Sequence, residues 1–186
     1  MIGLAIAVVL FAAVHLVPAF PRLRAGLRVR FGRQYGLVFG AASAATLIAV
    51  VFAKRAAAFV PLYDPPAWGW HAALGLMLAA ACCLSVFLFR GSLRQTLRLP
   101  LALATLLWGV AHLCANGDVG GVVLFGGMAV YGALQFGLGW INGVKPSPDI
   151  RGGHDLLSLF MGLAFFGIAV QLHAAVIGVP VLVLTR

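Results

Sequence analysis

Three histidines of this sequence lie inside long apolar stretches, where an ionisable side chain is costly and is a candidate for function by default. They are His15, His112 and His173. A neutral imidazole is a common metal ligand, and two imidazoles from different helices are a usual way for a helical bundle to hold a haem iron. The alternative is a neutral histidine that only hydrogen-bonds a neighbouring helix. The sequence therefore indicates histidine-based metal or haem chemistry, with His15 and His112 as the first candidates.

The surroundings of these two histidines suit a flat cofactor, because small residues beside aromatic ones leave room for it and give it a surface to stack on. Within about one turn of His112 lie Trp108, Gly109, Ala115 and Asn116, and near His15 lie Phe11, Ala12 and Ala19. Trp108 and Asn116 are therefore interpreted as cofactor-binding residues. An aromatic stripe at helical spacing is also compatible with ordinary packing.

The remaining histidines and the cysteines are interpreted as structural. His71 and His154 lie near the ends of apolar stretches and can reach water. Cys82, Cys83 and Cys114 are odd in number and lack the spacing of a metal or redox site, so they are taken as small packing residues.

The acidic residues argue against one class of membrane protein. All four are aspartates, and each lies at the end of an apolar stretch. Proton pumps and cation-coupled transporters usually depend on a carboxylate within the membrane, which these positions do not supply. Asp118, in the tight link Asn116-Gly117-Asp118, is expected to cap the helix that follows it.

The elements that position these residues are charge-free apolar stretches. The chain has 186 residues, 63% hydrophobic and 9% charged, whereas soluble domains have roughly a quarter charged residues. A helix needs about 20 apolar residues to cross the hydrocarbon core, and its backbone groups must be paired within the segment. The sequence predicts an all-α polytopic integral membrane protein, a six-transmembrane-helix bundle forming a single domain over residues 1–186. The approximate spans are 2–21, 34–53, 67–89, 99–117, 119–141 and 156–178.

The formal net charge of +9 reflects membrane topology rather than nucleic acid binding, because the 13 Lys and Arg residues are distributed unevenly among the loops. Ten follow the first, third and fifth spans, and three lie in the second loop and the tail. The positive-inside rule then places both termini outside the cytoplasm. We expect contact with anionic membrane lipids, and we expect loop Arg22–Arg33 to lie on the membrane surface. The first span is expected to be retained, since no basic residue precedes it and a basic run follows it.

Stripes of small residues predict where helices approach closely. They recur at four-residue spacing on the second span as Gly36, Gly40 and Ala44, and on the fifth as Ala129, Ala133 and Gly137. Both stripes are expected to face the interior of the bundle.

The fourth span reads Trp108-Gly-Val-Ala-His112-Leu-Cys-Ala-Asn116-Gly-Asp118 and is followed by Leu124-Phe125-Gly126. With the opening Phe11-Ala-Ala-Val-His15 and the closing His173 with Gly178-Val-Pro180, this chain resembles the NnrU family of bacterial membrane proteins over essentially its whole length. The resemblance implies a location in the bacterial inner membrane. The distribution of basic residues then predicts that both termini are periplasmic.

The resemblance also implies a cofactor and a role. The family's first member is associated with denitrification, in the handling of nitrite and nitric oxide. A plant relative, the 15-cis-zeta-carotene isomerase, is a membrane enzyme with haem b, and its ligand segments resemble Val14-His15 and Trp108 to His112. His15 and His112 are thus expected as axial ligands of haem b. At about 1.5 Å per residue, His15 lies roughly 9 Å and His112 roughly 20 Å from the inner boundary of the membrane. His173 is the alternative partner of His112, because these two histidines both lie in the outer half of the membrane.

Two positions depart from the relatives. The isomerase has a cysteine, proposed as an alternative ligand, where this chain has Gly109, so the resemblance does not extend to such a ligand switch. The family usually reads Arg-His-Pro where this chain has Arg98-Leu99-Pro100. Any chemistry that this histidine performs in the relatives is therefore not expected of this chain.

The expected function is that of an NnrU-type membrane protein that binds haem b and acts in nitrogen-oxide metabolism, alongside partners that include nitrogen-oxide enzymes. One alternative is a haem-dependent isomerase acting on a lipophilic small molecule, a polyene such as a cis-carotenoid. The other is a haem-free accessory factor whose histidines only join helices.

Overall fold

The computed structural model describes residues 1–146 and 148–181, and this part of the chain is built from helices. The α-helices are α1 (Ile2–Leu16), α2 (Pro21–Phe31), α3 (Tyr35–Ala56), α4 (Gly69–Phe89), α5 (Leu93–Leu97), α6 (Pro100–Ala115), α7 (Val119–Gly121), α8 (Gly127–Ile141) and α9 (His154–Ile177). Two 3₁₀ turns, η1 (Val17–Ala19) and η2 (Gly32–Gln34), flank α2, and a π-helical segment, η3 (Val122–Gly126), joins α7 to α8. The prediction of an all-α fold is confirmed for the described residues.

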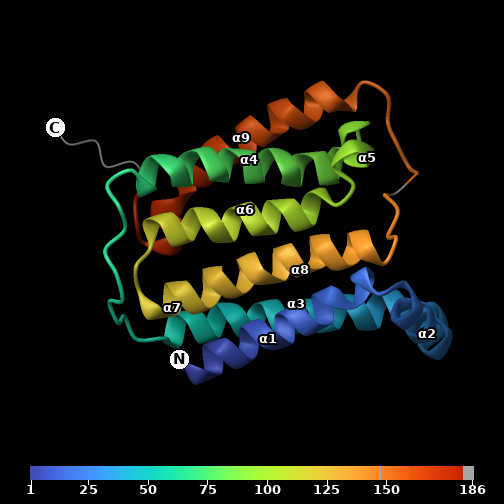
Figure 1. Cartoon of the computed structure of the whole chain (residues 1–186), viewed down its shortest axis with the longest axis horizontal. Helices are drawn as coiled ribbons and strands as arrows, with labels where there is room; N and C mark the ends of the chain where they lie inside the picture. The colour runs from blue at the N-terminus through green and yellow to red at the C-terminus, as the bar shows by residue number, and fades with distance from the viewer. Residues whose placement is uncertain (147, 182–186) are drawn as a thin grey trace.

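Five helical segments are long and apolar enough to cross a membrane, and these are Ile2–Ala19, Pro21–Ala56, Gly69–Phe89, Val119–Ile141 and His154–Ile177. Helix α6 is apolar but has only 16 residues, which is about 24 Å of helix against a hydrocarbon core of about 30 Å. It nevertheless runs alongside α4 and α8 from one end of the bundle to the other (Figure 1). The chain is thus a multi-pass membrane protein, and a sixth crossing by α6 stays a prediction.

Local sequence signals set where the helices begin and end. Pro21 and Pro100 occupy the first positions of α2 and α6, where the missing amide costs no helical hydrogen bond. Asp118 caps the α7–η3–α8 helix, as predicted, by accepting a hydrogen bond from the Gly121 amide at 2.8 Å. At the other end of the chain, Gly178 ends α9 with a φ of 87°, which glycine adopts without a Cβ penalty.

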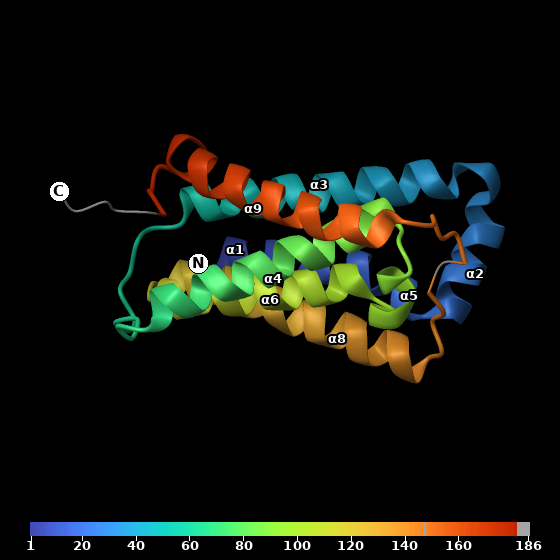
Figure 2. The ribbon, with the colours of Figure 1, turned by 90° about the horizontal axis from the view of Figure 1, so that it is seen from above.

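The helices form one curved layer with two free edges. Packing contacts run from α3 to α1, then to α8, α6, α4 and finally α9. The edge helices α3 and α9 have their extensive contacts on one side only, with α1 and α4 respectively. Figure 2 shows that both edges lie on the same side of the layer, so the layer curves. In the described part of the chain, the bundle is therefore open between α3 and α9. In the most apolar segment of each of these two helices, only 6% of the residues are buried.

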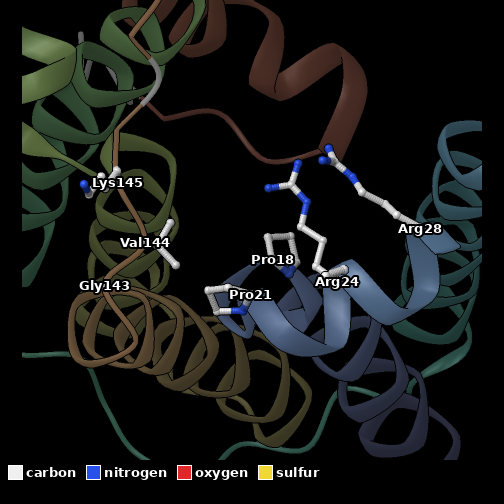
Figure 3. A pocket seen from close by; sticks show the side chains of 8 residues that line it. Pro18, Pro21, Arg24, Arg28, Gly143, Val144 and Lys145 are labelled. Carbon is white, nitrogen blue, oxygen red and sulfur yellow. The ribbon is translucent and has the colours of Figure 1, made fainter.

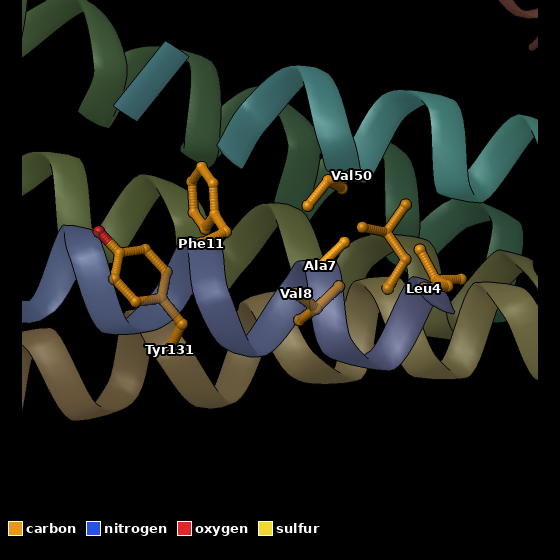
Figure 4. Packing of buried hydrophobic residues seen from close by; sticks show 7 residues of the cluster. Leu4, Ala7, Val8, Phe11, Val50 and Tyr131 are labelled. Atoms are coloured by element: carbon orange, nitrogen blue, oxygen red, sulfur yellow. The ribbon is translucent and has the colours of Figure 1, made fainter. Parts of the chain in front are cut away.

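The hydrophobic core lies where α1 meets α3 and the α7–η3–α8 helix. Its α1 residues, Leu4, Ala7, Val8 and Phe11, are three or four positions apart and so share one face. Val50 from α3, Leu124 from η3 and Tyr131 from α8 complete the cluster. Figure 4 shows Val50 above Ala7, and Tyr131 beside the turn of α1 that carries Phe11.

The predicted small-residue seam on α3 is wrong. Gly36, Gly40 and Ala44 are exposed, and a Cβ added at either glycine would meet nothing within 4 Å. The seam on α8 is wrong in part, because Ala129 is buried whereas Ala133 is exposed and Gly137 faces open space.

The real seam joins α6 to α8. A Cβ on Gly132 would lie 2.6 Å from the Leu106 amide nitrogen, and one on Gly109 would lie 2.6 Å from the Phe125 carbonyl oxygen. Real Cβ atoms do not come so close to backbone atoms, so these two glycines allow the helices their close approach. One glycine of this seam belongs to α6 and the other to α8. A search for small residues repeated along a single helix therefore does not find the seam.

The two ends of the bundle carry different charges. Helix α2, the α4–α6 connection and the α8–α9 loop meet at the end shown on the right of Figure 1. These segments and the turns beside them contain the ten basic residues that the topology prediction assigned to the cytoplasm. The first turn of α1 and the last turn of α9 are both at the opposite end (Figure 1). Arg186, which the same prediction assigned to the outside, lies beyond the described residues.

The opposite end is held together by the loop between α3 and α4. The amides of Leu62 and Tyr63 donate to the Gly117 carbonyl oxygen at 2.8 and 3.0 Å, and the Val119 amide donates to Val60 O at 2.9 Å. The Tyr63 hydroxyl donates to the Leu113 carbonyl oxygen and, at 2.8 Å, to Asn116 O. This loop therefore closes over the turn between α6 and α7.

Candidate functional site

His15 lies in the last turn of α1, and its ring is fixed by the preceding turn. Its Nδ1 is 2.8 Å from the Phe11 carbonyl oxygen, and its ring stacks on the Phe11 ring with centroids 3.8 Å apart. The four-residue spacing of Phe11 and His15 places both on one face of the helix. The sequence thus orients this imidazole locally, before any other helix contributes.

Two other helices contribute aromatic rings around His15. The Tyr131 ring of α8 meets the imidazole edge to face at 6.2 Å, and the Phe39 ring of α3 lies 6.4 Å away. Tyr131 also contacts Phe11 at 5.6 Å. His15 is therefore half-buried at the place where α1, α3 and α8 meet.

His112 in α6 has a closely similar environment. Its Nδ1 is 2.9 Å from the Trp108 carbonyl oxygen, one turn earlier. Its ring stacks on Phe125 at 4.3 Å, while Trp108 lies 5.0 Å from His112 and 5.1 Å from Phe125. Three rings thus surround one position between α6 and η3.

Phe125 belongs to the π-helical segment η3. Single π-turns inside α-helices are uncommon and are often found at functional sites. The backbone of this segment also approaches α6 closely, since the Phe125 carbonyl oxygen is the nearest atom to a Cβ built on Gly109. Phe125, Phe39 and Tyr131 were not identified from the sequence as neighbours of the histidines, because they come from other helices.

The hydrogen bonds of His15 and His112 leave one ring nitrogen of each available. A carbonyl oxygen only accepts, so Nδ1 must be the protonated nitrogen in both rings. Within the described residues, no hydrogen bond involves Nε2 of either ring. A neutral imidazole with Nδ1–H on a backbone carbonyl and a free Nε2 is the usual state of a metal-ligating histidine.

The same hydrogen-bond pattern recurs elsewhere, so it does not select the ligands. Nδ1 of His154 lies 2.9 Å from the Phe89 carbonyl oxygen, and Nδ1 of His173 lies 2.6 Å from that of Val179. His71 instead meets the Trp70 ring edge to face at 4.8 Å. Among the described residues, no three His, Cys, Asp or Glu side chains gather to hold a metal ion by themselves. A haem iron, by contrast, takes only axial ligands from the protein.

His15 and His112 contact different parts of one long helix. His15 lies against Tyr131 and His112 against Phe125, and these two residues are about 9 Å apart along the helix axis. No ring contact joins the two histidines in the described part of the chain. His173 lies near the end of the edge helix α9, at the same end of the bundle as the last turn of α6, which carries His112 (Figure 1).

The other two predicted cofactor residues have structural contacts. Trp108 packs against the hydrophobic core as well as against His112. The Asn116 side-chain amide donates to the His112 carbonyl oxygen at 2.8 Å, and its own carbonyl accepts from Tyr63. Asn116 therefore ends α6 and secures the turn that carries His112.

Comparison with known protein families identifies one match, which covers nearly all of the helices described above. A family model described as NnrU protein matches residues 3–181, which is nearly the whole chain. No curated protein and no solved structure matches it.

Proposed function

The chain belongs to the NnrU family, and on this premise we propose that it binds haem b through membrane-embedded histidines and acts in bacterial nitrogen-oxide metabolism. His15 and His112 would hold the haem iron, beside Trp108. Bound haem would supply an iron that exchanges electrons. The role in nitrite or nitric oxide handling rests on the family resemblance.

The observation that carries the proposal is that His15 and His112 each combine an Nδ1–carbonyl hydrogen bond with a ring stacked on a phenylalanine. Each has Nδ1 engaged with the carbonyl oxygen one turn back, at 2.8 Å for His15 and 2.9 Å for His112, and no residue that the structure describes hydrogen-bonds to Nε2 of either ring. Each also stacks on a phenylalanine, which fixes the plane of the ring. This donor set fits haem b, which requires neutral imidazoles of fixed orientation.

A second pair of histidines, His112 with His173, is an alternative to the pair His15 with His112. Two nitrogen ligands of one metal lie about 4 Å apart, because each metal–nitrogen bond is about 2 Å. His15 and His112 contact residues of the α7–η3–α8 helix that are about 9 Å apart along its axis. His173 is the alternative partner, because the C-terminal ends of α6 and α9, which carry His112 and His173, lie at the same end of the bundle (Figure 1).

An absorption spectrum of the full-length protein, purified in detergent after expression with ample haem, tests the proposal. Haem bound by His15 and His112 predicts that His15→Ala and His112→Ala each remove or shift the Soret band. If His173 is the partner of His112, His173→Ala changes the band and His15→Ala does not. His71→Ala is the matched control, since this ring lacks the Nδ1–carbonyl bond and lies at the end of α4.

A second control guards against unfolding. His154 has the same Nδ1–carbonyl bond as the proposed ligands but lies at the first residue of α9, in the basic end. His154→Ala should keep the Soret band although it loses a comparable hydrogen bond. A colourless, well-folded wild-type protein would contradict haem binding and favour the haem-free accessory factor.

The open edge of the layer favours one further candidate, a haem-dependent isomerase of a lipophilic polyene. In the described part of the chain, α3 and α9 have no extensive contacts with each other, so this lipid-facing side is where a molecule dissolved in the membrane would approach the α1 and α6 histidines. A carotenoid that copurifies with the haem protein would support this candidate. Loss of nitric oxide handling in a strain without the protein, with unchanged carotenoids, would support the nitrogen-oxide role.

A further inference from the structure

A cavity of about 360 Å³ lies at the basic end of the bundle, between α2 and the loop after α8. Arg24, Arg28 and Lys145 are its charged residues, and Pro18, Pro21 and Val144 form apolar parts of its wall. In Figure 3, the guanidinium groups of Arg24 and Arg28 extend from α2 over the same side of the cavity, and Lys145 lies across from them on the loop. Three cations from two segments thus surround one space.

The walls of this cavity are held in place by hydrogen bonds. The Asn142 side-chain amide donates to the Ala19 carbonyl oxygen at 2.9 Å and so ties the end of α8 to the turn before α2. The Val144 amide donates to Gly139 O at 2.8 Å, and Arg98 Nε donates to the Val144 carbonyl oxygen at 3.1 Å. The loop that presents Lys145 is therefore fixed relative to α2.

The cations on α2 are placed by helical spacing. Arg24 and Arg28 are four residues apart, so they share one face of the helix. The Arg28 guanidinium carbon also lies 5.6 Å from the centroid of the Tyr35 ring, which restricts where this side chain can go. Arg22 and Arg30 belong to the same helix but do not line the cavity.

The positive charge of the cavity is not balanced by acidic residues in the described part of the chain. No acidic residue lines it, and within the described residues none of its three cations forms a salt bridge. Cations gathered around one space repel each other, and a doubly charged anion among them removes that repulsion. Arginine forks and a lysine ammonium together suit the oxygens of a phosphate group.

We propose that this cavity binds a phosphate group, and that Arg24, Arg28 and Lys145 are its ligands. The group is either the headgroup phosphate of an anionic phospholipid or free inorganic phosphate. Basic pockets at the cytoplasmic face of helical membrane proteins bind lipid headgroups in this way, and the apolar wall of Pro18, Pro21 and Val144 suits the glycerol part of a lipid. This site is separate from the histidines and does not depend on haem.

Native mass spectrometry of the full-length protein tests the site, with phosphatidylglycerol as one probe and inorganic phosphate as the other. The site variant is Arg24→Gln with Lys145→Gln. The matched control is Arg22→Gln with Arg30→Gln, which removes the same charge from the same end of the molecule outside the cavity. The proposal predicts that the site variant binds at least one of the two probes about tenfold or more weakly than the control does.

A cavity-filling variant separates the role of the space from the role of the charge. Ala25 lines the cavity and is exposed on α2, so Ala25→Leu narrows the cavity while all cations and the helix remain. It should weaken binding of the same probe without lowering the thermal unfolding temperature. If the wild-type protein binds phosphatidylglycerol but not inorganic phosphate, the ligand of the cavity is a lipid headgroup. If it binds inorganic phosphate in neutral detergent, the ligand is the free anion.

Two results would overturn the site. Equal losses in the site variant and the matched control would mean that the arginines attract anions only as a diffuse charge. Unchanged binding in Ala25→Leu together with unchanged binding in the site variant would mean that the cavity holds neither probe.

Discussion

Lys54 and Asp118 form an ion pair, with 3.1 Å between Nζ and Oδ2, although 64 residues separate them in the sequence. The pair joins the last turn of α3 to the cap of the α7–η3–α8 helix. Asp118 has a side chain that is 12% exposed and also accepts from the Gly121 amide, so a single carboxylate both caps a helix and connects it to another. At this end of the bundle, opposite the end with ten basic residues, one buried acidic group therefore holds two helices together.

Replacement of Asp118 separates its two contacts. Asp118→Asn keeps a capping oxygen and loses the ion pair, so it should cost less than about 1 kcal/mol of unfolding free energy. Asp118→Leu loses both contacts and should cost about 1–2 kcal/mol. Chemical unfolding in detergent measures the difference, and equal losses in the two variants would show that the cap contributes nothing.

The pH dependence of this end follows from the same carboxylate. Burial of Asp118 by itself would raise the pKa of its carboxyl, but the Gly121 amide and Lys54 outweigh burial and hold that pKa below its ordinary value. A lowered folded-state pKa means that the contribution to stability is complete above the unfolded pKa of about 3.9 and disappears as pH falls through the folded value. The stability difference between wild type and Asp118→Asn should therefore shrink below about pH 4. A difference that stays constant down to pH 2 would contradict this linkage.

Gly109 limits the chemistry that α6 can carry. A Cβ at this position would lie 2.6 Å from the Phe125 carbonyl oxygen and 2.7 Å from the Ala129 amide nitrogen, and neither backbone atom can move freely. Gly109→Ala should destabilise the bundle by about 1–3 kcal/mol, and Gly109→Cys by at least as much. Gly137→Ala is the matched control, because this glycine of α8 has open space around it. A Gly109→Ala protein as stable as that control would show that α6 and α8 do not pack so closely.

The membrane topology can be tested at α6, which is apolar but shorter than the five candidate spans. Reporter fusions after Arg30 and after Arg151 should read cytoplasmic, because both positions belong to the basic end, and a fusion at Arg186 should read external. A fusion after Gly117 should also read external if α6 crosses the membrane with its 16 residues. A cytoplasmic reading at Gly117 would reduce the number of crossings, and a cytoplasmic reading at Arg186 would remove the six-span prediction.

Much of this fold could be predicted from sequence because membrane helices are local features. A charge-free stretch of about 20 residues must form a helix in lipid wherever it lies in the chain. The predicted spans 67–89 and 119–141 therefore agree closely with α4 and with the Val119–Ile141 helix. The same locality explains the confirmed cap at Asp118 and the positions of His15 and His112 beside Phe11 and Trp108, one turn away.

The partners of these residues were decided by the tertiary structure alone. In a soluble helix, polar and apolar residues mark the outer and inner faces, but lipid is as apolar as the bundle interior. The stripe of Gly36, Gly40 and Ala44 therefore predicts an interface on α3 that the structure does not have, whereas the close approach occurs at Gly109 and Gly132. The ion pair of Lys54 with Asp118 has no local signal either, because the two residues meet only when distant helices pack together.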